Sequence, residues 1–438
     1  MFFSFLQNNL TFGGIVAKEI VAIVIFLLSF IIPVYGQSVG RVEIHTFHSS
    51  ALGINKSYYI YLPANYDASS DRYPVVYFLR QHESEWFDGT RSGRNGNTLK
   101  NVLDSLIDKG YIGKTIAVGP STGSDDSQVY ACVNMLHPEL TTSPGIGTGR
   151  FEDYFTRDLI PHIDSSFRTI PDRGHRGIDG FSLGGFASTV LALRNPQYFC
   201  SVGSYDGTLM WRNLVNLSGG IDMTWLGAVS DQLFGAMFGL PRDVNYMLQF
   251  SVLNILMSAS PEKLDSIRSI RFHIHAGYST DLSVGNLLRS IPFVDSLAAK
   301  GIINTFPDIR LSPTAIHTFG YADMHASMSL IKHWETFQRT TGVNTHQAAV
   351  PASAQLYQNY PNPFNPTTVI GYALSKSGHV SIRVFDLLGR EITTLVNEEK
   401  FAGKYQVTWG ASQIPSGVYF YCLQADNYKE VKKLILLR

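Results

Sequence analysis

The residues whose types and spacing could carry out chemistry centre on Ser182. It lies in the segment Gly180-Phe-Ser-Leu-Gly184, between a short apolar run that predicts a strand and residues 186–194, which predict a helix. Glycine on both sides of a serine permits a tight strand-to-helix turn that exposes the hydroxyl as a nucleophile. The backbone N–H of Leu183 would then face a developing oxyanion. The pattern indicates acyl transfer; the alternative is an ordinary glycine-rich turn.

A nucleophilic serine needs a base, and the base needs an acid that orients it. With a serine turn of this kind the chain order is serine, acid, histidine. Asp281 lies on the loop after the apolar strand 271–275, where such an acid belongs, and Asp295 is a weaker candidate because its context is helical. His317 and His325 compete for the base. We favour His325, which lies in a turn that leads into a helix.

The elements that must position these residues follow from hydrophobic periodicity. Between residues 41 and 342, short β-branched or aromatic runs such as 58–62 and 75–79 alternate with longer amphipathic stretches. This alternation predicts an α/β fold, a mostly parallel sheet with flanking helices. From residue 356 to 438, short alternating strands separated by turn residues predict a small C-terminal β-sandwich.

Four segments are predicted along the chain. They are a signal peptide, a large α/β domain, a linker and a sandwich, at residues 1–36, 37–342, 343–355 and 356–438. The signal peptide is inferred from the apolar run 20–32 and the small residues after it. An uncleaved membrane anchor is the alternative. Residues 208–266, rich in large apolar side chains, are expected to form a cap over the active site, with ordinary helical core as the alternative.

Composition excludes several functional classes. The 438 residues include 35 Lys and Arg and 35 Asp and Glu, 45% are hydrophobic and 16% are charged. Such a chain is not intrinsically disordered, and it lacks the basic surplus that nucleic-acid binding requires. Cys132, Cys200 and Cys422 do not have zinc-site spacing. The sequence also contains no other ligand cluster of convincing spacing and no nucleotide-binding loop, so no metal and no cofactor is expected. Cys132 and Cys200 could form a disulfide or be two buried free thiols.

Several motifs carry a resemblance to a known family. They include Tyr58–Tyr66 (YYIYLPANY), Tyr154–Arg168 (YFTRDLIPHIDSSFR), Gly180–Gly185 (GFSLGG) and Ser201–Gly207 (SVGSYDG). Over about 300 residues the sequence resembles the esterase family of the α/β hydrolases, which contains enterochelin-esterase-like and feruloyl- or acetyl-esterase-like enzymes. The resemblance implies an α/β-hydrolase fold and a serine carboxylic-ester hydrolase. It implies that Ser182, Asp281 and His325 are the nucleophile, the acid and the base.

One loop departs from the family pattern. Members usually have a His-Gly pair after the strand that corresponds to 75–79, where a loop N–H completes the oxyanion hole. This chain has Arg80-Gln81-His82-Glu83 instead. The resemblance implies a donor at Arg80 or Gln81, with a geometry that the motif leaves open. Because losing one oxyanion donor costs roughly 10²–10³ in turnover, a slow esterase or one of unusual specificity is compatible with this loop.

The C-terminal segment has motifs of its own. Leu356–Pro366 (LYQNYPNPFNP) is followed by Val384–Arg390 (VFDLLGR) and ends with Lys432–Arg438 (KKLILLR). These motifs closely resemble the C-terminal sorting domain of the type IX secretion system. The resemblance implies that residues 356–438 engage the type IX secretion machinery and that the protein is secreted or held at the outer-membrane surface. A carbohydrate-binding or spacer sandwich is the alternative.

Taken together, these features predict a secreted serine esterase. Its substrate would be a small-molecule or carbohydrate-linked ester, hydrolysed through an acyl-enzyme on Ser182. One alternative is an acyltransferase that uses a sugar or alcohol acceptor. The other is a non-catalytic surface or carbohydrate-binding protein on a hydrolase fold, suggested by the altered loop at 80–83.

Overall fold

The structure is a computed structural model of the 438-residue chain. It describes residues 39–80, 82–122, 132–142, 144–209, 231–340, 354–376, 378–400, 403–425 and 427–437. The predicted signal peptide and nearly all of the predicted linker lie outside the described residues. Both therefore remain predictions.

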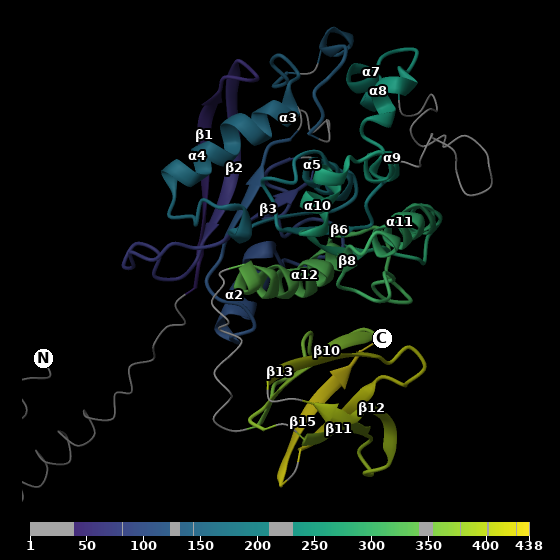
Figure 1. The fold of residues 1–438 in the computed structure, drawn as a ribbon. Coiled ribbons are helices and arrows are strands. Elements are labelled where there is room, and N and C mark those ends of the chain that lie inside the picture. Colours follow the sequence, from purple (N-terminus) through teal and green to yellow (C-terminus); the bar gives the residue numbers. More distant parts are fainter. Residues whose placement is uncertain are drawn as a thin grey trace, which may run out of the picture. The chain divides into compact units, whose positions relative to one another are not determined.

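An eight-stranded sheet is the centre of the larger part of the chain (Figure 1). Its strand order is β1-β2-β4-β3-β5-β6-β7-β8. Strand β2 runs antiparallel to both β1 and β4, and the neighbours from β4 to β8 are parallel. The strands are β1 (Arg41–Ser49), β2 (Ile54–Leu62), β3 (Val75–Leu79), β4 (Ile116–Pro120), β5 (Arg176–Gly180), β6 (Ser201–Tyr205), β7 (Arg271–His275) and β8 (Ile303–Asn304).

The parallel strands are short apolar runs because both faces of the sheet are covered. Strand β3 shows this most clearly. Val75, Tyr77 and Leu79 belong to the apolar cluster on one face, and Val76 and Phe78 belong to the cluster on the other. Successive side chains of a strand point to opposite faces, so an uninterrupted apolar run fits a strand buried on both sides.

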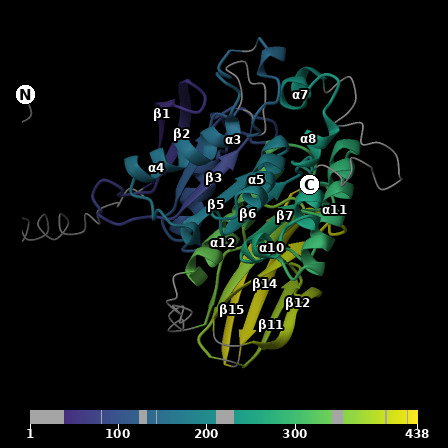
Figure 2. The ribbon, with the colours of Figure 1, turned by 45° about the horizontal axis from the view of Figure 1, so that its top comes forward.

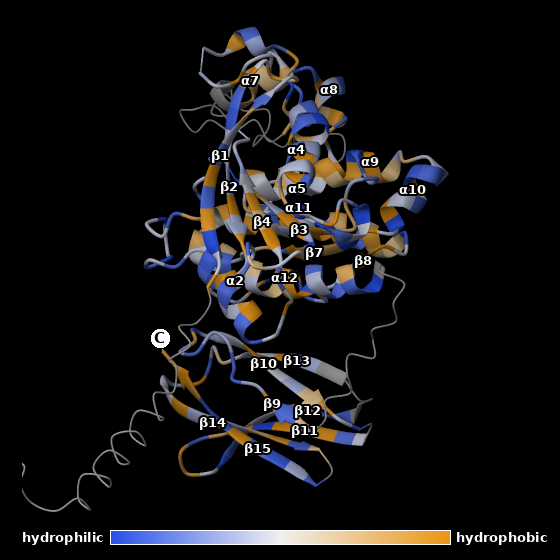
Figure 3. Cartoon of the chain, turned by 90° about the vertical axis from the view of Figure 1, so that its left-hand side faces the viewer, coloured by the Kyte–Doolittle hydropathy of each residue, from blue (hydrophilic) through white to orange (hydrophobic). Residues whose placement is uncertain are grey.

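Helices cover the two faces of the sheet (Figures 2 and 3). Helices α2 (Leu99–Asp108) and α12 (Phe319–Thr340) pack on one face. The apolar cluster of the other face includes side chains from α3 (Phe151–Asp153), α4 (Ile160–Ser166), α5 (Leu183–Arg194), α7 (Asp231–Phe238), α8 (Val244–Leu248), α9 (Val252–Met257), α10 (Pro261–Arg268) and α11 (Asp281–Ala299). Every residue of α5 except Arg194 is buried, which places this helix at the centre of its layer.

The predicted cap, residues 208–266, is described at residues 208–209 and from residue 231 onward. Phe234 and Met237 of α7 are buried in the same cluster as α5. The backbone N–H of Leu136 donates to the carbonyl of Met237, which ties α7 to the segment before α3. This part of the insertion packs as core. Residues 210–230 lie outside the described residues, so the cap itself remains a prediction.

Two antiparallel sheets form the C-terminal part, in the orders β13-β10-β9 and β12-β11-β14-β15. The inward residues Val380, Ile382 and Val384 of β11 alternate with Ser381 and Arg383 and join one buried apolar cluster. This packing is that of a β-sandwich, as predicted. The strands are β9 (Gln355–Leu356), β10 (Thr367–Leu374), β11 (Gly378–Phe385), β12 (Glu391–Lys400), β13 (Gly403–Gly410), β14 (Gly417–Ala425) and β15 (Tyr428–Leu436).

Two smaller questions from the sequence concern cysteines and membrane helices. Cys132, Cys200 and Cys422 are all buried free thiols, so the structure does not join Cys132 to Cys200. Among the residues that the structure describes, no helix has both the length and the apolar character needed to cross a bilayer.

Candidate active site

Ser182 lies on the turn between β5 and α5, at the carboxyl edge of the parallel strands. Its backbone has φ 59° and ψ −123°, a region that a residue with a side chain occupies only under strain. Its N–H donates to the carbonyl of Tyr205 at 3.0 Å, and its carbonyl accepts the N–H of Phe186 at 3.0 Å. These bonds hold the turn in the strained conformation and fix the backbone position from which the Ser182 side chain extends.

The two glycines of the motif allow the chain to pass through this turn. A Cβ on Gly180 would overlap the carbonyl of Gly184, and a Cβ on Gly184 would overlap the carbonyl of Leu79. The same Cβ on Gly184 would lie 2.9 Å from the backbone nitrogen of Arg80. The absence of a side chain at residue 184 therefore brings the start of α5 against the loop that follows β3.

His317 is the hydrogen-bond partner of Ser182. Its Nε2 lies 2.9 Å from Ser182 Oγ, and its Nδ1 lies 2.6 Å from Asp206 Oδ2. The His317 side chain is 18% exposed, whereas that of Asp206 is fully buried. A serine, an imidazole within hydrogen-bond reach and a carboxylate on the other ring nitrogen form the arrangement that activates a serine nucleophile.

Asp206 is held in place by bonds from α11 and from the loop after β7. Its Oδ1 accepts the N–H of Gly277 at 3.1 Å, and its Oδ2 accepts the hydroxyl of Ser283 at 3.0 Å. Asn286 donates its side-chain amide to the Asp206 carbonyl at 3.0 Å. A buried carboxylate needs such partners to offset the loss of water. The same bonds fix the orientation of the Asp206 carboxylate, so that it faces His317.

The structure does not bring His325 to Ser182, and the histidine beside the nucleophile is His317 instead of the favoured His325. His325 is fully buried within α12, where its Nε2 lies 3.1 Å from Asp179 Oδ1 and its Nδ1 lies 3.1 Å from His275 Nδ1. His317 precedes α12 and reaches the carboxyl edge of the sheet. His325 lies about two turns inside the helix and faces the sheet itself.

The carboxylate at His317 also differs from the one expected. Asp281 is the first residue of α11, and its side chain lies outside the described residues. Asp295 is exposed on the same helix. The carboxylate that contacts His317 is that of Asp206, directly after β6. Its signal in the sequence was an acidic residue at the carboxyl end of the strand beside the nucleophile strand, a position where the sites of parallel sheets are found.

The expected oxyanion donors come from two places. Leu183 is the first residue of α5, so its N–H has no acceptor inside the helix and remains available. Arg80 follows β3, and its carbonyl accepts the hydroxyl of Thr122 at 2.7 Å, which fixes this side of the loop. Gln81 lies outside the described residues. Leu183 begins α5 and the backbone nitrogen of Arg80 lies close to Gly184, so both residues adjoin the nucleophile turn, and their role as oxyanion donors stays a prediction.

A second group of serine, histidine and aspartate lies inside the molecule. His333 Nδ1 is 2.6 Å from Ser201 Oγ, and His333 Nε2 is 3.3 Å from Asp179 Oδ2. Ser201, His333 and Asp179 are all fully buried. An ester has no route to a serine inside a covered strand, so we interpret this group as structural. Within the described ranges, no set of three or more ligating side chains is arranged to hold a metal ion.

The protonation of this buried network follows from its surroundings. Burial lowers the pKa of His273 and His275 well below the usual value, and it also lowers the pKa of His333. Burial alone would raise the pKa of Asp179, but contacts with His325 and His333 outweigh it and the pKa falls. Burial thus favours the neutral form of these three imidazoles, and the neighbouring histidines favour the ionised form of Asp179.

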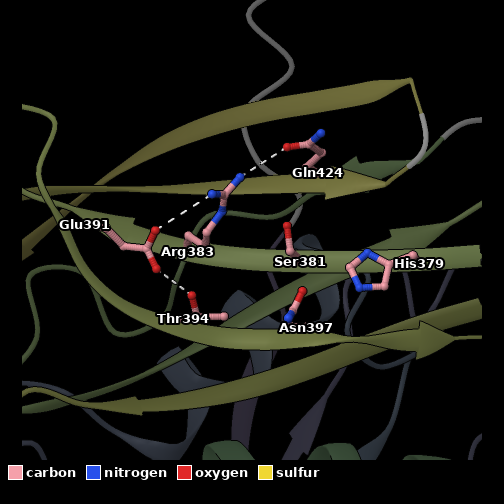
Figure 4. A pocket seen from close by; sticks show the side chains of 7 residues that line it. All are labelled: His379, Ser381, Arg383, Glu391, Thr394, Asn397 and Gln424. Atoms are coloured by element: carbon pink, nitrogen blue, oxygen red, sulfur yellow. Dashed lines mark hydrogen bonds and ion pairs between the residues drawn. The ribbon is translucent and has the colours of Figure 1, made fainter.

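The sandwich has a polar recess of about 540 Å³ on the face of β11, β12 and β14 (Figure 4). Nη1 of Arg383 lies 3.8 Å from Oε2 of Glu391, and Nη2 of Arg383 donates to Oε1 of Gln424 at 3.3 Å. The hydrogen bonds and the ion pair drawn in Figure 4 are typical of a polar surface. They do not join a nucleophilic side chain to a base. The lining side chains are those of His379, Ser381, Arg383, Glu391, Thr394, Asn397 and Gln424.

The strand order and the serine turn between β5 and α5 define the α/β-hydrolase fold, which confirms the predicted fold class. Two solved structures share it. A ferulic acid esterase has a TM-score of 0.53 and 20% identity, over 68% of this chain and 99% of its own. An S-formylglutathione hydrolase from Agrobacterium tumefaciens has a TM-score of 0.50 and 17% identity, over 68% of this chain and 96% of its own.

Two segments of the chain match family models. Residues 49–263 match the family described as "Putative esterase", and residues 358–437 match the "Secretion system C-terminal sorting domain". These two matches agree with the families that the sequence motifs resemble.

Curated relatives match part of the chain. Esterase Rv1288 of Mycobacterium tuberculosis is 26% identical over 246 residues, which are 55% of this chain and 47% of that protein. An endo-1,4-beta-xylanase/feruloyl esterase of Xylanibacter ruminicola is 27% identical over 175 residues, which are 38% of this chain and 22% of that protein. The chain spans about half the length of the first of these relatives and less of the second.

Proposed function

We propose that this protein is a serine esterase that hydrolyses a carboxylic ester through an acyl-enzyme on Ser182. His317 acts as the base, and Asp206 acts as the acid that orients it. The single observation that carries the proposal is the pair of contacts from His317, 2.9 Å to Ser182 Oγ and 2.6 Å to Asp206 Oδ2. Such a complete set of contacts favours catalysis over a non-catalytic role for the fold.

In the first half of the reaction, Ser182 Oγ attacks the ester carbonyl carbon while His317 Nε2 takes the hydroxyl proton. Asp206 keeps the other ring proton on Nδ1 and stabilises the imidazolium that forms. The N–H of Leu183 donates to the oxyanion. The imidazolium then gives its proton to the departing alkoxide, and the acyl group remains on Ser182.

In the second half, water replaces the alcohol. His317 Nε2 takes a proton from the water as its oxygen attacks the acyl carbon, and then returns that proton to Ser182 Oγ. The carboxylic acid leaves and the enzyme is restored. A sugar or alcohol in place of water would give the acyltransferase alternative, which analysis of the products with and without such an acceptor distinguishes.

Hydrolysis of a small aryl ester tests the proposal. We expect the purified chain to hydrolyse 4-nitrophenyl acetate, and S182A to lose at least about 10³-fold of this activity, because the nucleophile is gone. S166A alters an exposed serine at the end of α4 and is the matched control, with unchanged activity. Equal activity in S182A and the wild type would refute the proposal.

We also propose that the sorting domain directs the enzyme to the type IX secretion machinery, so that the enzyme acts outside the cell or on its surface. The match of residues 358–437 supports this route, and the feruloyl-esterase name of one relative supports a carbohydrate-linked ester as substrate. Removing residues 358–437 should leave the protein inside a host that has this machinery. Export of the shortened chain would overturn the assignment.

A further inference from the structure

Arg80 places a guanidinium group beside the nucleophile turn, and among the described residues no carboxylate forms an ion pair with it, although Glu85 acts on it at longer range. Its guanidinium carbon lies 4.9 Å from the ring centre of Phe181 and 5.8 Å from that of Phe319. Its Nε is buried and has no hydrogen-bond partner among the described residues. Burial lowers the pKa of the group. A buried donor of a charged group without an acceptor is rare in folded proteins, because the lost hydration is not replaced.

A neighbouring arginine shows what a structural guanidinium looks like in this region. Arg94 lies 4.4 Å from the same Phe319 ring, and its Nε and Nη2 donate to Asp323 at 2.9 and 2.7 Å. Its Nη1 also donates to the Asp88 carbonyl at 3.0 Å. The donors of Arg94 are used within the protein. Nε of Arg80, like Nε of Arg91 and Arg176, has no hydrogen-bond partner among the described residues. Those two arginines form ion pairs with Asp88 and Asp164, whereas Arg80 forms none in the described part of the chain.

The position of Arg80 links it to the chemistry. The ring of Phe181, the residue before the nucleophile, also contacts the His317 ring, with 4.6 Å between ring centres. The guanidinium of Arg80 and the imidazole of His317 thus lie against one aromatic side chain. The Arg80 backbone adjoins Gly184 at the start of α5. An ester bound at Ser182 would bring its substituents within reach of this guanidinium.

We infer that Arg80 binds a carboxylate carried by the substrate, so that the natural substrate is an ester that bears a second, ionised carboxyl group. Guanidinium matches carboxylate geometry with two parallel hydrogen bonds, and such charged pairs are strong where water is excluded. The inference rests on the proposed esterase function. The extra charge could belong to the acid part or to the alcohol part of the ester, and the two are separated by experiment.

The test compares matched neutral and anionic esters. Methyl butyrate and monomethyl glutarate place the charge on the acid side, and phenyl acetate and 4-acetoxybenzoate place it on the alcohol side. We expect the wild type to prefer the anionic member of one pair by about 10- to 100-fold in kcat/KM, the range of a hydrogen-bonded charge pair. In R80M this preference should vanish while hydrolysis of the neutral esters persists. R80K should retain part of it.

R91Q is the matched control, since Arg91 is a more exposed arginine of the same loop and pairs with Asp88. It should keep the preference. A wild type without preference in either pair would overturn the inference, even if R80M failed to fold. So would an equal loss on neutral and anionic esters in R80M, which would assign Arg80 to the oxyanion or to the fold. Failure of the esterase proposal is distinct, because the neutral esters would then not be hydrolysed at all.

Discussion

Ser182, His317 and Asp206 form a chain of contacts in which each residue constrains the next. The strained turn fixes Ser182 Oγ, and His317 bridges that oxygen to the buried Asp206 carboxylate. Asp206 is itself fixed by Gly277 and Ser283. Because each group is held by its neighbour, the loss of any one of them should act mainly on the rate of the chemical step.

The first prediction separates the two candidate acids. We expect D206N to lower kcat by about 10⁴-fold, because an amide next to His317 Nδ1 favours the wrong imidazole tautomer. D281N should stay within about threefold of the wild type. Steady-state kinetics on 4-nitrophenyl acetate measure both. The reverse pattern, an inactive D281N and an active D206N, would return the role to Asp281.

The site could be predicted from the sequence where its signal is local. Ser182, Gly180 and Gly184 follow from one short motif, since strand, turn and helix are contiguous there. His317 and Asp206 do not, because their partnership joins two loops that are 111 residues apart in the chain. In the sequence alone, nothing distinguishes a histidine inside a helix from one just before it. Which of the two histidines reaches Ser182 depends on how α12 packs against the sheet, and that arrangement exists only in the folded chain.

At the scale of elements, the turn at Ser182 depends on the close approach of two backbone segments. The start of α5 can touch the end of β3 because residue 184 has no side chain. We expect G184A to be destabilised by at least about 2 kcal/mol and to lose esterase activity, because the overlap with the Leu79 carbonyl moves the helix. Urea unfolding and kinetics measure the two effects.

The control is G235A in α7, where a Cβ would lie 3.9 Å from Arg242 Nη1, an ordinary contact without overlap. Replacing this helical glycine should leave activity unchanged and add up to about 1 kcal/mol of stability. A G184A variant as stable and as active as the wild type would contradict the close approach.

A second element, the buried network between α12 and the central strands, should make stability depend on pH. Burial lowers the pKa of His273, His275 and His333, so these imidazoles bind protons in the unfolded chain before they do so in the folded one. Stability is therefore fully present above pH about 6.5. It should fall below that pH by up to about 1.4 kcal/mol per pH unit for each histidine.

Urea unfolding between pH 5 and 8 measures this slope. Replacing His273 with asparagine should reduce the slope of unfolding free energy against pH by the contribution of one histidine. This change in slope is expected whatever the variant does to stability at pH 8. A stability that stays constant from pH 8 to pH 5 would show that these imidazoles are not buried as neutral groups.

At the scale of the whole molecule, the core of the hydrolase part and the core of the sandwich are separate apolar clusters. The sequence predicts two such parts, because its strand pattern changes from alternation with helices to short antiparallel runs. All residues proposed for the reaction lie between positions 80 and 317. We expect a chain that ends at Thr340 to keep kcat/KM on 4-nitrophenyl acetate within about threefold, whereas complete loss would show that the sandwich is needed for the site.

The central claim is that Ser182 is a nucleophile activated by His317. It is tested most directly by labelling the purified chain with a fluorophosphonate and mapping the modified peptide by mass spectrometry. We predict one phosphonylated serine, Ser182, and labelling that is slowed by at least about 10³-fold in H317A but remains rapid when the exposed His48 is replaced by alanine. An unlabelled protein, or a label on Ser201, would contradict the claim.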